Sequence, residues 1–172
     1  EKVGAIVENP DTYMYLSGWD NLKLTANMYK NISDEAIKDI VKLVDLETRI
    51  HDKVSKYSLG MRQRLGIARA LINKPNILIL DEPTNHLDIK YQLQLMRIVK
   101  SLNIEVIAAI HDLNIAAMYC DKIYVLKDGK IVKCGKTNEV LTKKLIKDVY
   151  EVDADVIVNQ GKSEGQAVLG RQ

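Results

Sequence analysis

The chain has 172 residues, and 25 Lys and Arg against 23 Asp and Glu leave a formal net charge of +2. This balance excludes a surface built to coat nucleic acid and an acidic tail. The hydrophobic fraction of 47% is ordinary for a folded globular protein, and the two cysteines, which lack metal-ligand spacing, predict neither a disulfide framework nor a zinc site.

The first third of the chain predicts one strand followed by helices. The chain begins with Glu1 rather than Met and runs directly into an apolar stretch, which indicates a piece of a longer protein. Residues 3–7 are β-branched and apolar, so they predict a strand. Serines and acidic residues open the helices, which are expected over 16–30 with an opening at Asp20, from Ser33 onward, and from Ser58 to about residue 73.

From residue 77 onward, strand and helix patterns alternate. The runs 77–80 and 104–110 are continuously apolar, as in strands buried on both faces, yet far shorter than the ~20 residues of a membrane-spanning helix. Asp88 and Asp112 are expected to cap the helices that follow these runs. The alternation predicts a parallel sheet with crossover helices.

The last third predicts a hairpin and short helices. Asp128 and Gly129 supply a two-residue turn between strands expected at 122–127 and 130–133. One helix or two short ones are expected over 137–148. The glycine-containing segment 159–172 is expected to be a frayed tail.

Two adjacent carboxylates, Asp81 and Glu82, directly follow the apolar run 77–80. Parallel sheets place ligands at the carboxyl ends of their strands. Asp81 could therefore hold Mg²⁺ through water, and Glu82 could polarise an attacking water. Taken alone, the pattern is equally compatible with two solvated carboxylates at the end of a strand.

Ser58 and Gly60 stand at the start of a predicted helix, followed by Arg62 and Arg64. The free N–H groups and the dipole of a helix start make an anion site, and the two arginines would add positive charge. A serine N-cap with exposed arginines is the structural alternative.

A histidine, His111, directly follows the apolar run 104–110. Because parallel strands end at the same edge of a sheet, His111 is expected to reach the site of Asp81 and Glu82. A lone histidine is more often structural than catalytic. His51 and His86 have no comparable placement and are interpreted as surface residues.

These features occur in one order: a serine-glycine helix start, an apolar strand ending in Asp-Glu-Pro (81–83), Asn-His-Leu-Asp (85–88), and a second apolar strand followed by His111. This order resembles the ATP-binding cassette of ABC transporters, from about residue 3 to about residue 156. The resemblance implies the α/β fold class, as part of a P-loop NTPase with a mainly parallel sheet flanked by helices and an α-helical subdomain. It also implies ATP and Mg²⁺ as cofactors.

The resemblance further divides the chain into four parts. They are a strand and Q-loop region (1–8), a helical signature subdomain (9–75), the Walker B half of a RecA-like core (76–158) and the frayed tail (159–172).

Some of the implied roles concern a partner subunit. Ser58, Leu59 and Gly60 are similar to the signature sequence that grips the γ-phosphate of ATP held by a second cassette. Asp88 resembles the D-loop aspartate that links the two sites across a dimer.

The other implied roles concern the chain's own site. Asp81 resembles the Walker B aspartate, a metal ligand, and Glu82 resembles the catalytic glutamate. His111 resembles the catalytic switch histidine that contacts the γ-phosphate. Glu8 stands where the family usually has the Q-loop glutamine, which contacts the nucleotide and the metal-bound water.

The chain departs from the family pattern at several positions. Glu8 replaces that glutamine, Leu59 replaces a glycine and Met61 replaces a glutamine. The family's phosphate-cradling loop, G-x-x-x-x-G-K-[ST], belongs before Glu1 and is absent from this sequence. Without the N–H nest and the lysine of that loop, we expect the chain alone to bind MgATP poorly and not to turn it over.

The two halves resemble different branches of the family. Glu8 and the segment 57–65 are similar to antibiotic and lantibiotic export or self-resistance cassettes. The segments 111–117 and 139–150 are similar to cassettes of iron-siderophore and cobalamin importers. A mosaic gene or an assembled join would account for both, and neither cargo nor direction follows from the sequence.

The expected partners are transmembrane permease subunits and a second cassette, at the cytoplasmic face of the membrane, with no nucleic acid. The aromatic segment 13–19 follows the Q-loop position and either docks a permease or packs the helical subdomain. Two other functions stay open: a non-transport ABC ATPase acting on ribosomes or in DNA repair, and an inactive dimerisation fragment.

Overall fold

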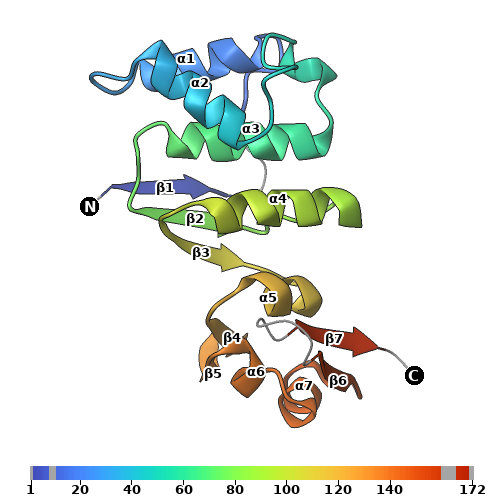
Figure 1. Cartoon of the computed structure of the whole chain (residues 1–172). Helices are drawn as coiled ribbons and strands as arrows, with labels where there is room; N and C mark the ends of the chain where they lie inside the picture. Colours follow the sequence, from blue (N-terminus) through green and yellow to red (C-terminus); the bar gives the residue numbers. More distant parts are fainter. Residues whose placement is uncertain (1, 8–10, 160–165, 171–172) are drawn as a thin grey trace. The chain divides into compact units, whose positions relative to one another are not determined.

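The computed structural model describes residues 2–7, 11–159 and 166–170, which belong to two compact units, Glu1–Ala109 and Ile110–Gln172 (Figure 1). The predicted division into four parts is finer than these two units and stays a prediction.

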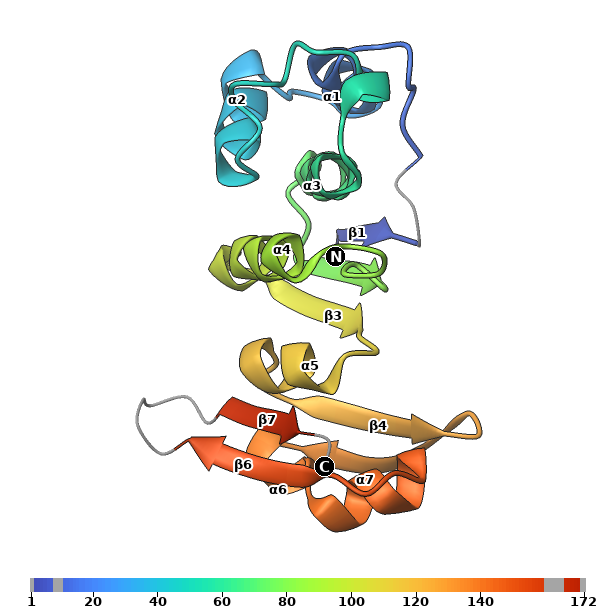
Figure 2. The same ribbon diagram turned by 90° about the vertical axis from the view of Figure 1, so that its right-hand side faces the viewer.

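A three-stranded parallel sheet forms the base of the first unit. Its strands are β1 (Val3–Ile6), β2 (Ile77–Asp81) and β3 (Glu105–Ala109), in the order β1-β2-β3. The predicted parallel sheet is therefore present. Figure 2 shows helix α3 (Leu59–Leu71) lying between this sheet and a layer made by α1 (Gly18–Ala26) and α2 (Asp34–Leu43). Helix α4 (Ile89–Ser101) connects β2 to β3.

The two faces of the sheet are covered differently. Leu78 and Leu80 of β2 are buried at 0% and 1% exposure. On the opposite face, Val3, Ile79 and Ile107 are 54%, 40% and 61% exposed. Burial on both faces, which the apolar runs predicted, is therefore found on one face only, because side chains alternate across a strand and the helices of this unit pack on the other face.

Serines start the helices of the first unit. Helix α1 (Gly18–Ala26), α2 (Asp34–Leu43) and α3 each follow a serine whose Oγ accepts an N–H of the first turn. The first helix therefore begins after Ser17 rather than at the predicted Asp20. Each such cap stabilises a helix by about 1 kcal/mol.

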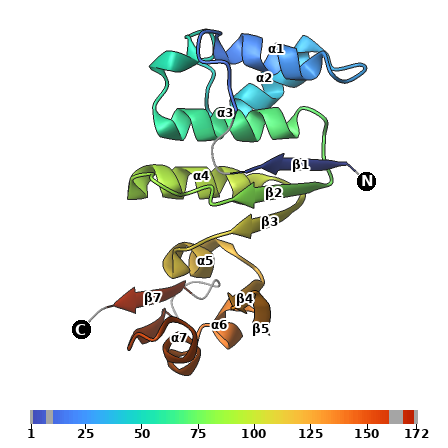
Figure 3. The same cartoon turned by 180° about the vertical axis from the view of Figure 1, so that it is seen from behind.

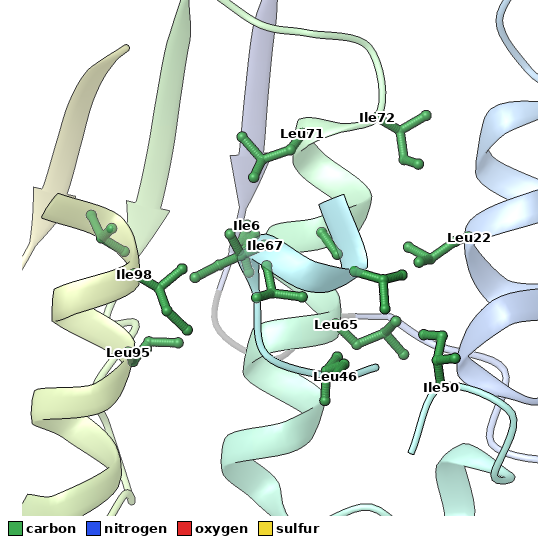
Figure 4. Close-up of a cluster of buried hydrophobic side chains, with 14 of the residues drawn as sticks. Ile6, Leu22, Leu46, Ile50, Leu65, Ile67, Leu71, Ile72, Leu95 and Ile98 are labelled. Atoms are coloured by element: carbon green, nitrogen blue, oxygen red, sulfur yellow. The ribbon is translucent and has the colours of Figure 1, made fainter. Parts of the chain in front are cut away.

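One hydrophobic core joins the helical layer to the sheet (Figure 4). Ile6 of β1 packs into the same cluster as Leu22 of α1 and Leu65 and Ile67 of α3. Burial of an aliphatic side chain of this size stabilises a fold by about 1.5–3 kcal/mol. This core fixes α3, and with it the residues at the start of α3, against the sheet. Trp19 of α1 is half-buried against the same core.

The second unit combines short helices with two hairpins (Figure 3). Strands β4 (Ile123–Lys127) and β5 (Lys130–Gly135) are antiparallel, and Asp128 and Gly129 have φ of 51° and 72° at the predicted turn. The helices are α5 (Leu113–Tyr119), α6 (Thr137–Val140) and α7 (Lys143–Tyr150).

The end of the chain differs from the frayed tail that the glycines predicted. Strand β6 (Asp155–Asn159) pairs antiparallel with β7 (Gln166–Gly170), because 166–170 is apolar enough to continue as a strand. Residues 160–165 and 171–172 of that tail lie outside the described residues.

Two further observations concern the described residues as a set. None of their helices is long and apolar enough to cross a membrane. Cys120 and Cys134 are not joined in a disulfide; Cys134 is exposed and Cys120 is half-buried.

Candidate functional site

The carboxyl end of β2 presents the two predicted carboxylates. Asp81 is the last residue of β2 and is paired with Ala109 of β3. The N–H of Glu82 donates to the oxygen of Ala109 at 3.2 Å. Glu82 has φ of +46°, a left-handed conformation that is uncommon outside glycine and often found at functional sites. The chain therefore turns sharply at Glu82.

The turn after Glu82 is fixed by its own hydrogen bonds. Asn85 donates its N–H to the oxygen of Glu82 at 3.1 Å and its Nδ2 to Oε2 of Glu82 at 2.7 Å. The buried residue Thr84 accepts from the N–H of Leu87 at 3.3 Å and from Nε2 of Gln92 at 3.2 Å. These bonds orient the Glu82 carboxylate and lead the chain to Asp88.

Asp88 occupies the N-cap position of α4, as predicted, but its side chain makes no capping hydrogen bond. Its side chain is exposed. The Asp88 carboxylate therefore does not cap the helix that it precedes.

The signature turn (Ser58, Leu59 and Gly60) starts α3. Oγ of Ser58 accepts the N–H of Met61 at 3.3 Å. The N–H groups of Leu59 and Gly60 have no intrahelical acceptor, because they belong to the first turn. Leu59 packs against the core, so its side chain anchors this turn, and the N–H groups of the turn lie at the positive end of the helix dipole.

Gly60 is not required by crowding within the chain. A β-carbon built on Gly60 would lie 3.5 Å or more from its nearest neighbours, all atoms of Tyr91, which is ordinary van der Waals contact. Glycine near a helix start weakens the helix. Gly60 is buried, and the position of its missing β-carbon faces Tyr91 of the same chain.

Tyr57, the residue before the signature turn, is held in place by a hydrogen bond. Its hydroxyl donates to the oxygen of Arg49 at 2.8 Å. Burial, and to a smaller extent the negative charge of Asp52, raises the pKa of Tyr57 from 10.0 to about 12. The phenol therefore stays protonated and keeps its hydrogen bond across the physiological range.

Arg64 does not contribute the positive charge that the sequence predicted for an anion site. Its side chain is only 11% exposed, and Nη1 donates to Oδ2 of Asp45 at 3.0 Å and to the main-chain oxygen of Asp45 at 2.7 Å. The arginine is thus occupied in fixing the end of α2.

The structure gathers most of the predicted residues in the first unit. The first residues of α3 and α4 and the carboxyl end of β2 lie on the same side of it (Figure 1). His111 belongs to the second unit, two residues beyond β3, and its role stays a prediction. Glu8 lies outside the described residues, so its predicted nucleotide and metal contacts also stay predictions.

Asp81 is the residue of β2 that the sequence predicts as a metal ligand. Among the described residues, no group of three or more His, Cys, Asp or Glu side chains could hold a metal ion. A single half-buried carboxylate at a strand end fits Mg²⁺, which usually takes one or two carboxylates plus waters and phosphates.

The sequence predicts no role for Asp45, Tyr91 or Gln94, and it marks Asn85 only as part of a motif, although each contacts a residue of this site or of its supporting helices. Asn85 lies within a recognisable motif and was detectable. The other three have no local pattern that distinguishes them from surface residues.

Comparison with known proteins gives many relatives. The family profile described as "ABC transporter" matches residues 1–85. An uncharacterised ABC transporter ATP-binding protein of Bacillus subtilis, YdbJ, is 46% identical over 153 residues, which cover 85% of this chain and 50% of the relative. A petrobactin import ATP-binding protein of Bacillus anthracis is 38% identical, covering 77% of this chain and 50% of the relative. A bacitracin transport ATP-binding protein of Bacillus licheniformis is 37% identical, covering 77% and 44%.

Solved structures give the same result. A chain described as cbiO1 from Clostridium perfringens, part of the ABC transporter complex cbiONQ, superposes with a TM-score of 0.75 at 29% identity, covering 84% of this chain and 61% of its own. The ATP-binding cassette MJ0796, in a dimeric post-hydrolysis state with ADP and Pi, superposes with a TM-score of 0.67 at 31% identity, covering 80% and 63%. The P-loop NTPase fold predicted from the motifs is therefore confirmed.

The chain spans about half the length of these curated relatives. The order of motifs, the fold and the relatives agree, and this chain belongs to the ABC transporter family of ATP-binding proteins.

Proposed function

We propose that this chain forms the helical and Walker B part of an ATP-hydrolysing cassette that powers an ABC transporter. The observation that carries the proposal is the joint placement of three features in one unit. These are a strand ending in Asp81 and a sharply turned Glu82, an uncommitted Asp88, and a helix start at Gly60 that no internal neighbour requires.

In this proposal the residues at the end of β2 serve the chain's own nucleotide. Asp81 holds Mg²⁺, directly or through water, and the ion, when bound, neutralises charge on the phosphates. Glu82, oriented by Asn85 at 2.7 Å, polarises the attacking water. His111 contacts the γ-phosphate, and Glu8 contacts the metal-bound water.

The signature turn serves the nucleotide of a second cassette. Ser58 and the first-turn N–H groups of Leu59 and Gly60 bind the γ-phosphate held by that partner. Asp88 contacts the partner across the dimer. The relative with ADP and Pi is described as a dimer, which supports this arrangement.

Transport requires permease subunits at the cytoplasmic face of a membrane. The relative cbiO1 is described as part of a transporter complex. Tyr13 and Tyr15 are 52% and 69% exposed, which favours docking over packing for these two rings, whereas Trp19 packs on the core. Replacing both tyrosines with Ala should reduce co-purification with the permease; unchanged assembly would contradict docking.

The two branches seen in the sequence also occur among the relatives, one named for bacitracin transport and one for petrobactin import. Both relatives are described as ATP-binding proteins, so the proposal concerns the energy source and leaves the cargo open.

The proposal is tested by MgATP binding and hydrolysis, compared between this chain and the complete polypeptide encoded by its gene. We expect hydrolysis only in the complete polypeptide, because the phosphate-cradling loop is absent from this sequence. The variant Glu82→Gln should retain ATP binding and lose at least about a hundredfold in turnover, as expected for removal of a general base.

Asp20→Asn, which changes a carboxylate in the first turn of α1, serves as the matched control and should leave turnover unchanged. A complete polypeptide that neither binds nor hydrolyses MgATP would overturn the proposal. Turnover by this chain alone, lost in Glu82→Gln, would show that other groups hold the phosphates.

A further inference from the structure

Two contacts join α3 to α4 on the side of the signature turn. In the first, the side chain of Tyr91 packs on Gly60, where a β-carbon would lie 3.5 Å from Cβ and 3.6 Å from Cγ of Tyr91. In the second, Oδ2 of Asp45 accepts from Nη1 of Arg64 at 3.0 Å and from Nε2 of Gln94 at 2.8 Å. We call these contacts together the α3–α4 seam.

The spacing of the seam fixes the two helices against each other. Gly60 and Arg64 are four residues apart on α3, and Tyr91 and Gln94 are three apart on α4, so each pair shares a helix face. The contacts therefore lie one helical turn apart. One contact would allow the helices to pivot, whereas two resist rotation as well as separation.

Asp45 is tied to α3 through its main chain, whereas its side chain is 70% exposed. It follows the last turn of α2 with φ of +55°, and its main-chain oxygen accepts a further bond from Arg64 at 2.7 Å. Arg64 also donates to the oxygen of Val44 at 3.3 Å. The amide of Gln94 thus joins α4 to a junction that already ties α2 to α3.

The seam also leads directly to Asp88. The N–H of Tyr91 donates to the main-chain oxygen of Asp88 at 2.8 Å in the first turn of α4. One side-chain contact and one hydrogen bond therefore separate Gly60 from Asp88. The signature turn and the D-loop are linked within the same subunit.

We propose that Tyr91 and Gln94 are positioning residues that hold the signature turn in place relative to Asp88, so that both reach the nucleotide site of a second cassette together. This inference rests on the proposed function, because it concerns how two cassettes meet. Neither side chain is assigned to the chain's own nucleotide, so their loss should weaken dimer formation and spare ATP binding.

The experiment uses the complete polypeptide carrying Glu82→Gln, in which slow hydrolysis lets the ATP-bound dimer accumulate. Sedimentation with saturating MgATP gives the dimer dissociation constant, and titration at low protein concentration gives the ATP affinity of the monomer. We expect Tyr91→Ala to weaken the dimer about tenfold and to change ATP affinity less than about twofold.

Two variants separate the ring contact from general effects. Tyr91→Phe keeps the ring and should dimerise as the parent does. Tyr29→Ala removes a tyrosine of matched exposure, 40% against 39% for Tyr91, from a place outside the seam and should also leave the dimer unchanged.

The polar contact is tested with a second pair. Gln94→Glu places a carboxylate against Asp45 and should weaken the dimer, whereas Gln94→Lys restores a donor and should recover it. The two Gln94 variants also test the positioning role of the seam if Tyr91→Ala fails to fold. A purely structural role would instead lower the melting temperature and the ATP affinity along with dimer formation.

The outcomes are distinguishable. Dimers of Tyr91→Ala and Gln94→Glu as tight as the parent would overturn the inference and leave the proposed function standing. A parent that neither binds MgATP nor dimerises with it would overturn the proposed function itself.

Discussion

Gly60 and Gly18 stand in the first turns of two helices, but for different physical reasons. Around Gly60 an added methyl group has room, so Gly60→Ala should raise the free energy of unfolding by about 0.5–1 kcal/mol. The same methyl group would lie against Tyr91, next to the N–H groups that are proposed to bind the partner's γ-phosphate. In the complete polypeptide we therefore expect higher stability together with weaker ATP-dependent dimer formation.

Gly18→Ala is the matched control for this prediction. Its β-carbon would meet the hydroxyl of Tyr57 and would lie 3.0 Å from the oxygen of Ile50. Overpacking of this kind lowers stability by about 1–3 kcal/mol. Urea unfolding of both variants should give shifts of opposite sign, and a destabilised Gly60→Ala would contradict the role assigned to Gly60.

Individual site residues can be predicted from the sequence where the neighbouring residues form a recognisable pattern. Asp81 and Glu82 are detectable because an apolar run precedes them, and Ser58 is detectable because it begins a helix pattern. Arg64 was interpreted wrongly as site charge, because its partner Asp45 lies 19 residues away in the chain. The partner of Gln94 lies 49 residues away, so no local pattern indicates that contact.

Among the elements, the turn that precedes α3 has a measurable dependence on alkaline pH. The pKa of Tyr57 is 10.0 in the unfolded chain and about 12 in the folded state. Between these values the unfolded state loses a proton that the folded state keeps. The contribution of the protonated Tyr57 phenol to the free energy of unfolding is therefore fully present below pH 10 and is lost as the pH rises toward 12.

The variant Tyr57→Phe isolates this contribution. Below pH 10 it should be less stable than the parent by about 1 kcal/mol, because the hydrogen bond to Arg49 is lost. Urea unfolding at a series of pH values should show this difference shrinking between pH 10 and 12. A difference that stays constant over that range would mean that the phenol ionises alike in both states.

Element types followed from the sequence more readily than their surroundings did. Serine caps, apolar runs and the Asp128–Gly129 turn each act within a few residues, and the structure places helices and strands accordingly. Pairing of β6 with β7 was missed, because three glycines in the last part of the chain favour an irregular tail. The exposure of one sheet face was missed as well, since continuous apolar runs predict burial without saying which element provides it.

For the molecule as a whole, the exposed sheet face has a consequence for solution behaviour. Val3, Ile79 and Ile107 lie on one face of three adjacent strands. Contiguous apolar surface of this kind favours self-association. We expect this chain to bind a hydrophobic dye and to associate as its concentration rises.

Ile107→Thr should reduce both effects, because it keeps a β-branched residue in β3 and removes apolar area. Ile89→Thr is the control, since Ile89 is 72% exposed on α4, away from the sheet. Equal dye binding by the two variants would show that the sheet face is not responsible.

The division into two units was not expected, because the alternating pattern runs through residue 109 without a linker composition. Contacts, rather than composition, define that boundary. Likewise, the order of motifs identified the family, whereas the joining of α3 to α4 required the folded chain.

Each of the two units also contains one residue that is suited to a fluorescence measurement. Trp19 is the only tryptophan and belongs to the first unit, and Cys134 is the exposed thiol of the second. A thiol-reactive acceptor dye on Cys134, with Cys120 replaced by Ser, would form a donor–acceptor pair with Trp19. Energy transfer from Trp19 would then report whether the two units change their separation between one solution condition and another.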